Sequence, residues 1–570
     1  MNYVRLSTAI TGNERNWTFI GVPKWKQDHT GHIYPPVWSY PNFDPDPSLV
    51  PEGYAHELAR LDFALLTYQP LADTDVSVDY KCPYGSVLHG GIVFRAMDSS
   101  RFYVVDIEDM GRKGNAYELT LWLQDATGYW KQLARGIAPH SVAHDKIVQR
   151  GCRTREEWNH SSPDWVTVRV QASGSFIRVS MDGRIVFETR DRTYPVGCAG
   201  LLGRGAVFFR NLTIEGIPAE LPAPWTTHKG ELPRFFYPGG EQPEGFNAYP
   251  IACRAGKATL AAWSHAPRLT NPSAPTFLVL TRSEDEGRSW SAPQRMFGRD
   301  GHNCYPSSIF SHRDGALSCL VSIAPVGGGE EGEPLPLVLR SADGGMNWSE
   351  VGEFTCGGRP LRARSEGGAP VSLYSPMMRL SDGSVVMCGY EYGTVPGGGV
   401  GSNAERLDRS LLFRSEDDGH TWNEPVYFDE TNFDHNECML AETEPGRLVA
   451  FMRTLSAPHM WTSTSDDGGR TWTPLVQSSV SAECPFLLRH SSGALVMGSR
   501  GGPGTCVTLS FDGGRTWTDT VCMSPSSAMM GMVEMADGRV LNVMHEGYRS
   551  PGYIRGQFFR VTPGGPVAAP

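Results

Sequence analysis

Two features that mark membrane proteins and nucleic-acid-binding proteins are missing from this sequence of 570 residues. No stretch approaches the roughly 18 consecutive apolar residues that a membrane-spanning helix requires. Positive charge is not in excess, because 51 Lys and Arg face 62 Asp and Glu and give a formal net charge of −11. A protein that binds nucleic-acid phosphates needs a basic face. We therefore expect neither a membrane partner nor a nucleic-acid partner.

Cysteine is also sparse. Twelve cysteines are too dilute for a disulfide scaffold, and none of them forms a CxxC pair. The N-terminal stretch MNYVRLSTAITGNERNW lacks the uninterrupted apolar segment of a secretory signal. We therefore expect reduced thiols and a cytoplasmic location, although a secreted chain from which a signal had been removed would look the same.

Metal-ligand and phosphate-loop patterns are missing as well. The histidines are scattered, and no His, Cys, Asp or Asn run has the spacing of a ligand set. No Gly-rich loop stands between a strand and a helix, as a phosphate site requires. We therefore predict no metal and no cofactor, and leave open a structural calcium ion in the N-terminal half.

Long amphipathic helical patterns are almost absent. Short runs such as GGIVFRAMD, YELTLWLQ and WVTVRVQ instead alternate apolar and polar residues and end in turn residues. The sequence also has 64 glycines and 42 prolines without low complexity, so turns are frequent. These patterns predict an all-β protein.

The N-terminal half shows strands without a repeated signature. Between residues 61 and 216 the clearest feature is a hairpin, SFIRVSMDGRIVFETRD, with an Asp182-Gly183 turn. A Gly-rich turn and a last strand follow it, in GCAGLLGRGAVFFRNLTIEG. This order resembles a concanavalin A-like jelly-roll sandwich of the laminin-G or glucanase-like kind. We expect irregular structure in residues 1–60 and a Pro-rich linker at 217–230.

The C-terminal half repeats one motif, Ser-x-Asp-x-Gly-x-x-Trp. The five copies are Ser283/Asp285/Gly287/Trp290, Ser341/Asp343/Gly345/Trp348, Ser415/Asp417/Gly419/Trp422, Ser465/Asp467/Gly469/Trp472 and Ser510/Asp512/Gly514/Trp517. Successive copies are 58, 74, 50 and 45 residues apart, which is typical of a propeller or a similar array. The motif suits a turn, because the carboxylate can accept main-chain N–H groups and glycine tolerates a positive φ.

This motif is the Asp box, and the half that carries it resembles the sialidase (BNR-repeat) superfamily of six-bladed β-propellers. Six related phrases of two strands each, beginning with NAYPIACRAGKATLAAWSH, support six blades between residues 231 and 570. The last blade has a degenerate box at residues 560–565, and we expect its outermost strand to come from residues 231–240. The box residues should be structural and not catalytic.

The order of strands within a blade predicts where a site lies. If the box joins strands 3 and 4, the start of strand 1 and the end of strand 2 meet at the opposite end, beside the axis, where propellers bind ligands. The residues at these positions are Asn247, His265, Asn303, Tyr305, Tyr374, Glu391, Tyr392, Glu437, Arg453, Glu483, Arg500, Met529, His545, Glu546, Tyr548 and Arg549. A set so rich in charge predicts a carbohydrate site.

The resemblance to sialidases transfers only in part. It places Glu437 as the residue that activates a catalytic tyrosine, and Arg453 and Arg500 as two members of the arginine triad that holds the carboxylate of sialic acid. The first arginine of that triad is missing, because the family's Arg-Ile-Pro is here Ala248-Tyr249-Pro250. The acid Asp has no counterpart in NPSAPTF (271–277), and the last blade begins near Met529 without the tyrosine. We therefore do not expect sialidase chemistry.

Glycoside cleavage can use two carboxyl groups that flank the scissile bond. Glu437 and Glu483 head adjacent blades, and each is followed by an arginine 16 or 17 residues later. They are our candidate catalytic pair, with Glu391 as a substitute and Glu546 as a weaker one. The arginines favour an acidic sugar, because a guanidinium binds a carboxylate through two parallel hydrogen bonds.

Three functions stay open at this point. The first is a glycoside hydrolase that degrades an oligosaccharide or polysaccharide, with the N-terminal sandwich as an accessory domain. The second is a polysaccharide lyase in which Tyr374, Tyr305, His265 or His545 removes a proton beside a uronic carboxylate. The third is a glycan-binding protein without activity. The sequence leaves open the sugar, the stereochemical outcome and the oligomeric state.

Overall fold

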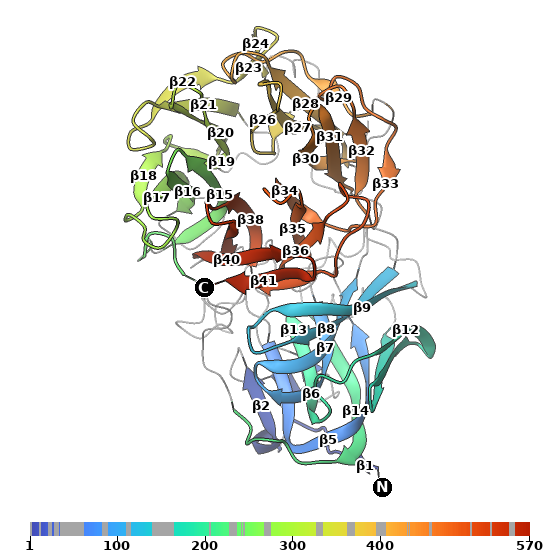
Figure 1. Cartoon of the computed structure of the whole chain (residues 1–570). Coiled ribbons are helices and arrows are strands. Elements are labelled where there is room, and N and C mark those ends of the chain that lie inside the picture. Colours follow the sequence, from blue (N-terminus) through green and yellow to red (C-terminus); the bar gives the residue numbers. More distant parts are fainter. Residues whose placement is uncertain are drawn as a thin grey trace. The chain divides into compact units, whose positions relative to one another are not determined.

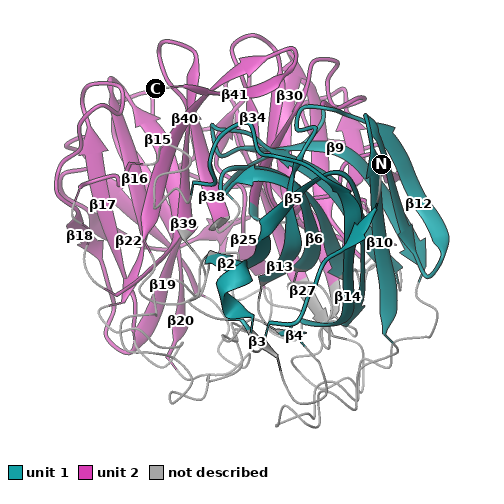
Figure 2. Cartoon of the chain, turned by 90° about the horizontal axis from the view of Figure 1, so that it is seen from below, with its two compact units in different colours: residues 1–234, 502–504, 519–526 teal, residues 235–501, 505–518, 527–570 magenta. Residues whose placement is uncertain are grey.

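The computed structural model is built of β-strands and divides into two compact units (Figures 1 and 2). Unit 1 comprises residues 1–234, 502–504 and 519–526, and unit 2 comprises residues 235–501, 505–518 and 527–570. No described helix is long and apolar enough to cross a membrane. The structure describes residues 3–10, 13–20, 25–27, 33–34, 62–81, 89–109, 116–139, 165–204, 207–226, 236–240, 242, 245–266, 275–326, 335–361, 371–394, 406–429, 431, 434–454, 459–501, 504–524, 527–546 and 553–569.

Unit 1 is organised by one long antiparallel strand, β5 (Asp62–Lys81). Its first half pairs with β2 and β13, and its second half pairs with β10 and β14. The strands β6, β7, β8 and β9 continue from β13, and β11 and β12 continue from β10. Their bounds are β6 His89–Asp98, β7 Arg101–Asp109, β8 Ala116–Gln124, β9 Trp130–Pro139, β10 Val166–Ser173, β11 Phe176–Met181, β12 Arg184–Arg190, β13 Gly197–Arg204 and β14 Phe208–Pro218.

Alternation of side chains along these strands produces the core of unit 1. In β10, for example, every second residue is buried, and these residues join one apolar cluster with residues of β5, β6, β7 and β14. The hairpin turn predicted at Asp182-Gly183 is confirmed: Met181 pairs with Arg184, and both turn residues have a positive φ, 49° and 76°. The likeness of this unit to a concanavalin A-like sandwich stays a prediction.

The N-terminal segment, expected to be irregular, contains short strands. These are β1 (Val4–Arg5), β2 (Trp17–Ile20), β3 (Lys26–Gln27) and β4 (Ile33–Tyr34), with a 3-10 turn η1 (Glu14–Asn16). β1 and β4 pair with β14, and β2 pairs with β5. Strands of two to four residues show no alternation in the sequence, and they form because longer strands offer them free edges.

Unit 2 is a ring of antiparallel sheets (Figure 1). Five sheets are self-contained within its described residues. The first sheet contains β15 (Phe246–Ala255), β16 (Ala258–Ala266), β17 (Phe277–Ser283) and β18 (Gln294–Phe297), and the second contains β19 (His302–Ser311), β20 (Leu317–Pro325), β21 (Leu335–Ser341) and β22 (Ser349–Glu353). The third contains β25 (Val371–Leu373), β26 (Met378–Arg379), β27 (Val385–Thr394), β28 (Arg406–Ser415) and β29 (Val426–Tyr427). The fourth contains β30 (Asn436–Glu444), β31 (Arg447–Arg453), β32 (Trp461–Ser465) and β33 (Val476–Gln477), and the fifth contains β38 (Ser527–Glu534), β39 (Arg539–Glu546), β40 (Ile554–Thr562) and β41 (Gly565–Ala569). A small hairpin, β23 (Thr355–Cys356) and β24 (Arg359–Pro360), stands apart.

The sixth place in the ring is built differently from the other five. The strands β34 (Glu483–Arg489), β35 (Leu495–Gly501) and β36 (Gly504–Ser510) fill the remaining place in the ring, but they are not a self-contained sheet of four. The strand that follows them, β37 (Val521–Ser524), belongs to unit 1, where it pairs with β9. Its pairing partner could not be read from a local repeat.

The closing strand of the ring also differs from the prediction. The fourth strand of the last sheet is the C-terminal β41, which pairs with β40. From the segment 231–240, the structure shows one bridge between Phe236 and Gly556, and residues 231–235 lie outside the described residues. The inner strand β38 lies against β15, so the last sheet of the chain adjoins the first.

The Asp boxes lie at one end of the ring and the predicted site lies at the other. In the fourth sheet, Ser465 of the box pairs with Leu448 at the start of β31, whereas Arg453 at its far end pairs with Asn436. The main-chain N–H of Gly468 in the box also donates to the carbonyl of Gly446, in the turn between β30 and β31, at 2.8 Å. Glu437 and the box are therefore at opposite ends of this blade, as predicted.

Candidate active site

Three inner strands begin with an irregular backbone. Tyr249 in β15, Glu437 in β30 and Cys484 in β34 have positive φ angles of 56°, 43° and 46°. The register shifts at each of these residues, so each strand carries a bulge there. A residue other than glycine in this conformation costs of order 1–3 kcal/mol, and such strain is concentrated at functional sites. The three residues with this strained backbone therefore lie at the same end of the ring.

Glu437 is the most buried carboxylate of this group, with 8% of the residue exposed. Its Oε1 accepts a hydrogen bond from Nη1 of Arg453 at 2.8 Å, and its Oε2 accepts one from the main-chain N–H of Cys484 at 3.0 Å. The strained backbone of Cys484 thus orients the carboxylate of the neighbouring blade. Both oxygens of the Glu437 carboxylate therefore have a hydrogen-bond donor.

Glu483 extends this contact into a chain of alternating charges. Its Oε1 lies 3.6 Å from Nη2 of Arg453, and its Oε2 accepts a hydrogen bond from Nη2 of Arg500 at 2.9 Å. The side chains are partly buried, with exposed fractions of 10% for Glu437, 19% for Arg453, 15% for Glu483 and 22% for Arg500. The order Glu437–Arg453–Glu483–Arg500 will be called the charged chain. Its two carboxylates raise the pKa of Arg453 despite its burial.

The two glutamates do not occupy matching positions, as the sequence suggested. Asn436 pairs with Arg453, and Glu483 pairs with Arg500. Glu483 therefore corresponds to Asn436, and Cys484 corresponds to Glu437. The carboxylates of Glu437 and Glu483 are offset by one position. Because each strand has an extra residue at its bulge, both carboxylates still reach the guanidinium of Arg453.

Tyr374 joins the charged chain from the blade before it. Its hydroxyl donates to the carbonyl of Pro485 at 3.4 Å. Burial raises the pKa of Tyr374 well above its usual value, and the negative charge of Glu437 raises it further. The phenol is therefore held in its protonated form beside the carboxylate.

A second group of residues comes from the last sheet and the first two. The main-chain N–H of Tyr249 donates to Nδ1 of His545 at 3.3 Å. Burial, with a smaller contribution from Arg500, lowers the pKa of His545 to about 3, so this imidazole is neutral. The ring of Tyr249 meets the ring of Tyr305 edge to face, with the centroids 5.2 Å apart.

Asn247 and His265 belong to a separate, buried group of hydrogen-bonded side chains. Oδ1 of Asn247 accepts a hydrogen bond from Nε1 of Trp263 at 2.8 Å and lies 3.0 Å from Nδ1 of His265. Since an amide oxygen only accepts, Nδ1 of His265 carries the proton. Burial lowers the pKa of His265 to about 4. These residues stabilise the first sheet and are poor candidates for proton transfer.

The remaining predicted residues are less central. Glu391 pairs within its own sheet, where its Oε2 accepts from Nη2 of Arg409 at 2.7 Å and its Oε1 accepts from the hydroxyl of Tyr427 at 2.5 Å. Asn303 is buried at the start of β19. The side chains of Tyr392 and Glu546, and all of Tyr548 and Arg549, lie outside the described residues.

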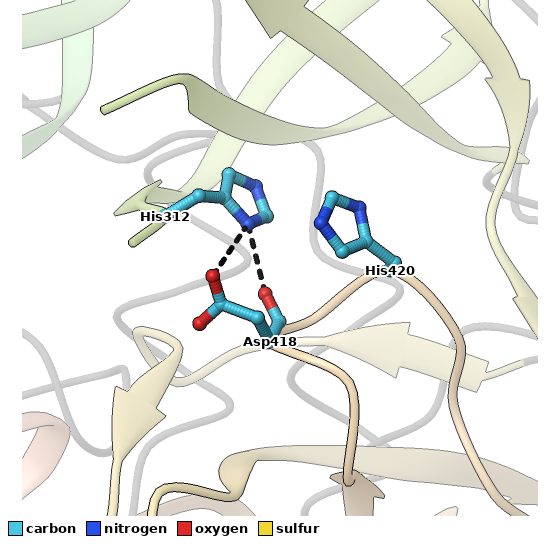
Figure 3. Close-up of side chains that lie close together, drawn as sticks. All are labelled: His312, Asp418 and His420. Carbon is cyan, nitrogen blue, oxygen red and sulfur yellow. Dashed lines mark hydrogen bonds and ion pairs between the residues drawn. The ribbon is translucent and has the colours of Figure 1, made fainter. Parts of the chain in front are cut away.

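One cluster at the Asp-box end has the composition of a metal site (Figure 3). His312, Asp418 and His420 place their ligand atoms within 4.8 Å of one another. However, Nδ1 of His312 lies 2.8 Å from the carbonyl of Asp418 and must donate to it, while Nε2 lies 2.6 Å from the hydroxyl of Ser318. The His420 ring stacks on His312 at 15°, with centroids 4.8 Å apart, so the two rings do not point at one ion. The cluster binds one blade to the next.

The sequence analysis missed Tyr249 and Cys484 as site residues. A signal was present, because both precede a proline at the start of a repeated phrase, in AYPI and ECPF. Tyr305 precedes a proline in the same way. The residue before a proline is pushed away from the right-handed helical region, so these dipeptides mark positions where the backbone of the strand is restricted.

Comparison with known proteins supports the propeller assignment. Residues 257–484 match the family model of the BNR repeat-like domain. No curated protein matches the chain. Similar solved structures include a protein of unknown function from Dyadobacter fermentans, with 20% identity, a TM-score of 0.47 and coverage of 57% of this chain and 98% of that one.

Two further similar structures are a sialidase and a trans-sialidase. The NanB sialidase of Streptococcus pneumoniae is 12% identical, with a TM-score of 0.44 and coverage of 86% of this chain and 95% of that one. The intramolecular trans-sialidase of leech is 12% identical, with a TM-score of 0.45 and coverage of 90% and 96%. The five Asp boxes and the ring of sheets agree with the family match, which shows that residues 257–484, within the propeller of unit 2, carry a BNR repeat-like domain.

Proposed function

We propose that the protein is a glycoside hydrolase and that the charged chain is its active site. One observation carries the proposal: two glutamates from adjacent blades share a single guanidinium, that of Arg453, at the axial end of a propeller. Hydrolysis of a glycosidic bond uses two carboxyl groups in different protonation states. The flanking arginines suit a substrate that carries a carboxylate.

The contacts suggest a role for each carboxylate. Glu437 keeps its partners, Arg453 and the N–H of Cys484, within the protein, and we assign it the role of nucleophile or base. Glu483 contacts both arginines. A substrate carboxylate that binds these arginines competes with Glu483 for them, and we assign Glu483 the role of the general acid that donates a proton to the leaving oxygen.

Sialic acid is not the proposed substrate. The resemblance to sialidases implies three residues: the first arginine of the triad, an Asp that acts as general acid, and a tyrosine at the start of the last blade. This sequence has Ala248 in place of the arginine and Met529 near the place of the tyrosine. The third falls in the segment 271–277, of which residues 271–274 lie outside the described residues. We expect negligible release of sialic acid from an aryl sialoside.

A test is to screen defined acidic and neutral oligosaccharides for product release by the wild-type protein and by Glu437→Gln. Glu444→Gln is a matched control, because Glu444 ends the same strand and its side chain is 71% exposed. The proposal predicts turnover of an acidic glycan that Glu437→Gln loses and Glu444→Gln retains. Binding of glycans without any turnover would support a binding protein instead.

The alternative reaction is elimination, with Tyr374 as the base beside a substrate whose carboxylate Arg453 neutralises. The position of Tyr374 next to Glu437 favours it, but the raised pKa of the phenol opposes it. The two reactions differ in product, because a lyase leaves an unsaturated sugar that absorbs in the near ultraviolet. Appearance of that absorbance during turnover would contradict hydrolysis.

A further inference from the structure

An aromatic group lies beside the charged chain. It consists of Phe246 and Tyr249 from the start of β15 and Tyr305 from β19. The ring of Tyr249 meets Tyr305 at 5.2 Å and Phe246 at 6.4 Å, in both cases edge to face. All three residues are partly exposed, unlike the aromatic residues of the cores.

The aromatic group and the charged chain lie at the same end of the ring, because Tyr249 stands at the bulged start of β15 as Glu437 and Cys484 do in β30 and β34. Arg500 and Cys484 both act electrostatically on the phenol of Tyr249, whose pKa is raised chiefly by burial. The site thus has a charged side, formed by the blades of β30 and β34, and an aromatic side, formed by the blades of β15 and β19.

The backbone conformation of Tyr249 is strained. Its φ of 56° would be free of strain in a glycine. The chain holds a tyrosine there, and the hydrogen bond from its N–H to the neutral His545 maintains the conformation. Pro250, which follows, is buried and fixes the backbone on the other side. A backbone strained in this way indicates that the direction of the side chain matters.

We propose that Tyr249 and Tyr305 form a subsite for a neutral sugar ring next to the acidic sugar held by the charged chain. The inference rests on the proposed function and specifies its substrate: an acidic residue linked to a neutral pyranose. The C–H groups on one face of a pyranose carry partial positive charge and pack on the electron-rich face of an aromatic ring. The hydroxyls of both tyrosines can bond the sugar's hydroxyls.

The test compares two substrates that share the acidic sugar. One carries a neutral sugar as the leaving group, and the other carries only a methyl group. Tyr249→Leu and Tyr305→Leu remove a ring and keep apolar volume, whereas Tyr249→Phe keeps the ring. We expect either leucine variant to raise KM for the disaccharide about 3- to 10-fold and to raise KM for the methyl glycoside by less. Tyr249→Phe should resemble the wild type more closely.

Two outcomes separate the subsite from the proposed function. If the wild type cleaves the disaccharide and folded Tyr305→Leu cleaves it equally well, the subsite is wrong and the hydrolase proposal stands. If the wild type cleaves neither substrate, the hydrolase proposal fails. Calorimetry then tests the subsite alone: the wild type should bind the disaccharide more tightly than the methyl glycoside, and Tyr305→Leu should lose that difference. Equal affinities in the wild type would overturn the inference. Because Tyr305 has no positive φ, its variant avoids the folding risk of a change at Tyr249.

Discussion

The two ends of the propeller both carry many carboxylates, but they use them differently. At the Asp-box end the aspartate of each box accepts hydrogen bonds from its own turn; Asp467, for example, accepts them from Ser465 and Thr471. At the axial end, Glu437 and Glu483 pair with arginines across two blades. The first arrangement recurs in all five boxes, and the second is built from residues that change from blade to blade. Residues that repeat in every box are therefore structural, and residues that differ from blade to blade form the candidate site.

Backbone strain supports the same distinction. At the box end, Glu286 and Asp418 have a positive φ where other boxes have Gly344, Gly468 or Gly513. Their carboxylates accept the main-chain N–H of a turn in the neighbouring blade, that of Ala536 at 2.9 Å and of Arg313 at 2.8 Å. Strain at this end therefore fastens blades together. At the axial end, Tyr249, Glu437 and Cys484 place side chains beside one another at a single site.

The largest expected effect is at the axial end. Glu483→Gln keeps the size of the side chain but removes its ionisable proton, so turnover should fall by about 10²–10⁴. The far-ultraviolet circular dichroism spectrum should be unchanged. Near wild-type turnover by both Glu483→Gln and Glu437→Gln would move the chemistry to the tyrosines and favour the lyase.

Arg453→Lys should have the next largest effect. A lysine offers a point charge in place of the planar guanidinium that contacts both glutamates, so we expect KM for an acidic glycan to rise about 10-fold. Arg447→Lys is the matched control, because Arg447 begins the same strand and is 41% exposed. An equal rise in KM in both variants would argue against a binding role for Arg453.

A change in a box should affect stability and spare activity. Asp467→Ala leaves the N–H groups of Arg470 and Thr471 without their acceptor, which should lower the free energy of unfolding by about 1 kcal/mol in urea titrations. Asp466→Ala is the control, because Asp466 is 82% exposed and its carboxylate lies 3.4 Å from Nε of Arg447. Equal destabilisation by the two changes would contradict the structural role of the box carboxylate.

The smallest effect concerns the pH dependence of stability. His265 has a folded-state pKa of about 4, below the value near 6.5 of an unfolded chain. Between these values the unfolded chain binds a proton that the folded protein does not, so stability falls as the pH decreases from about 6.5 to about 4. His265→Gln should flatten this slope in urea titrations at several pH values. An unchanged slope would show that His265 does not contribute to it.

The sequence predicted the repeated parts of the molecule well, because five boxes and alternating strands are local signals. It also found Glu437, Arg453, Glu483 and Arg500, since the order of strands assigns them to one end. It could not reveal the bulges, which shift Glu437 by one position relative to Glu483 and bring in Tyr249 and Cys484. It did not predict that Glu391 pairs with Arg409 and Tyr427, which come from outer strands of the same sheet.

The central claim is that catalysis belongs to the axial end and stability to the boxes. Turnover of an acidic oligosaccharide and the free energy of unfolding should be measured together for Glu437→Gln and Asp467→Ala. The account predicts that Glu437→Gln loses at least about 10² in turnover while staying folded, and that Asp467→Ala keeps its turnover while becoming less stable. Wild-type turnover by Glu437→Gln, with loss of turnover in folded Asp467→Ala, would contradict it.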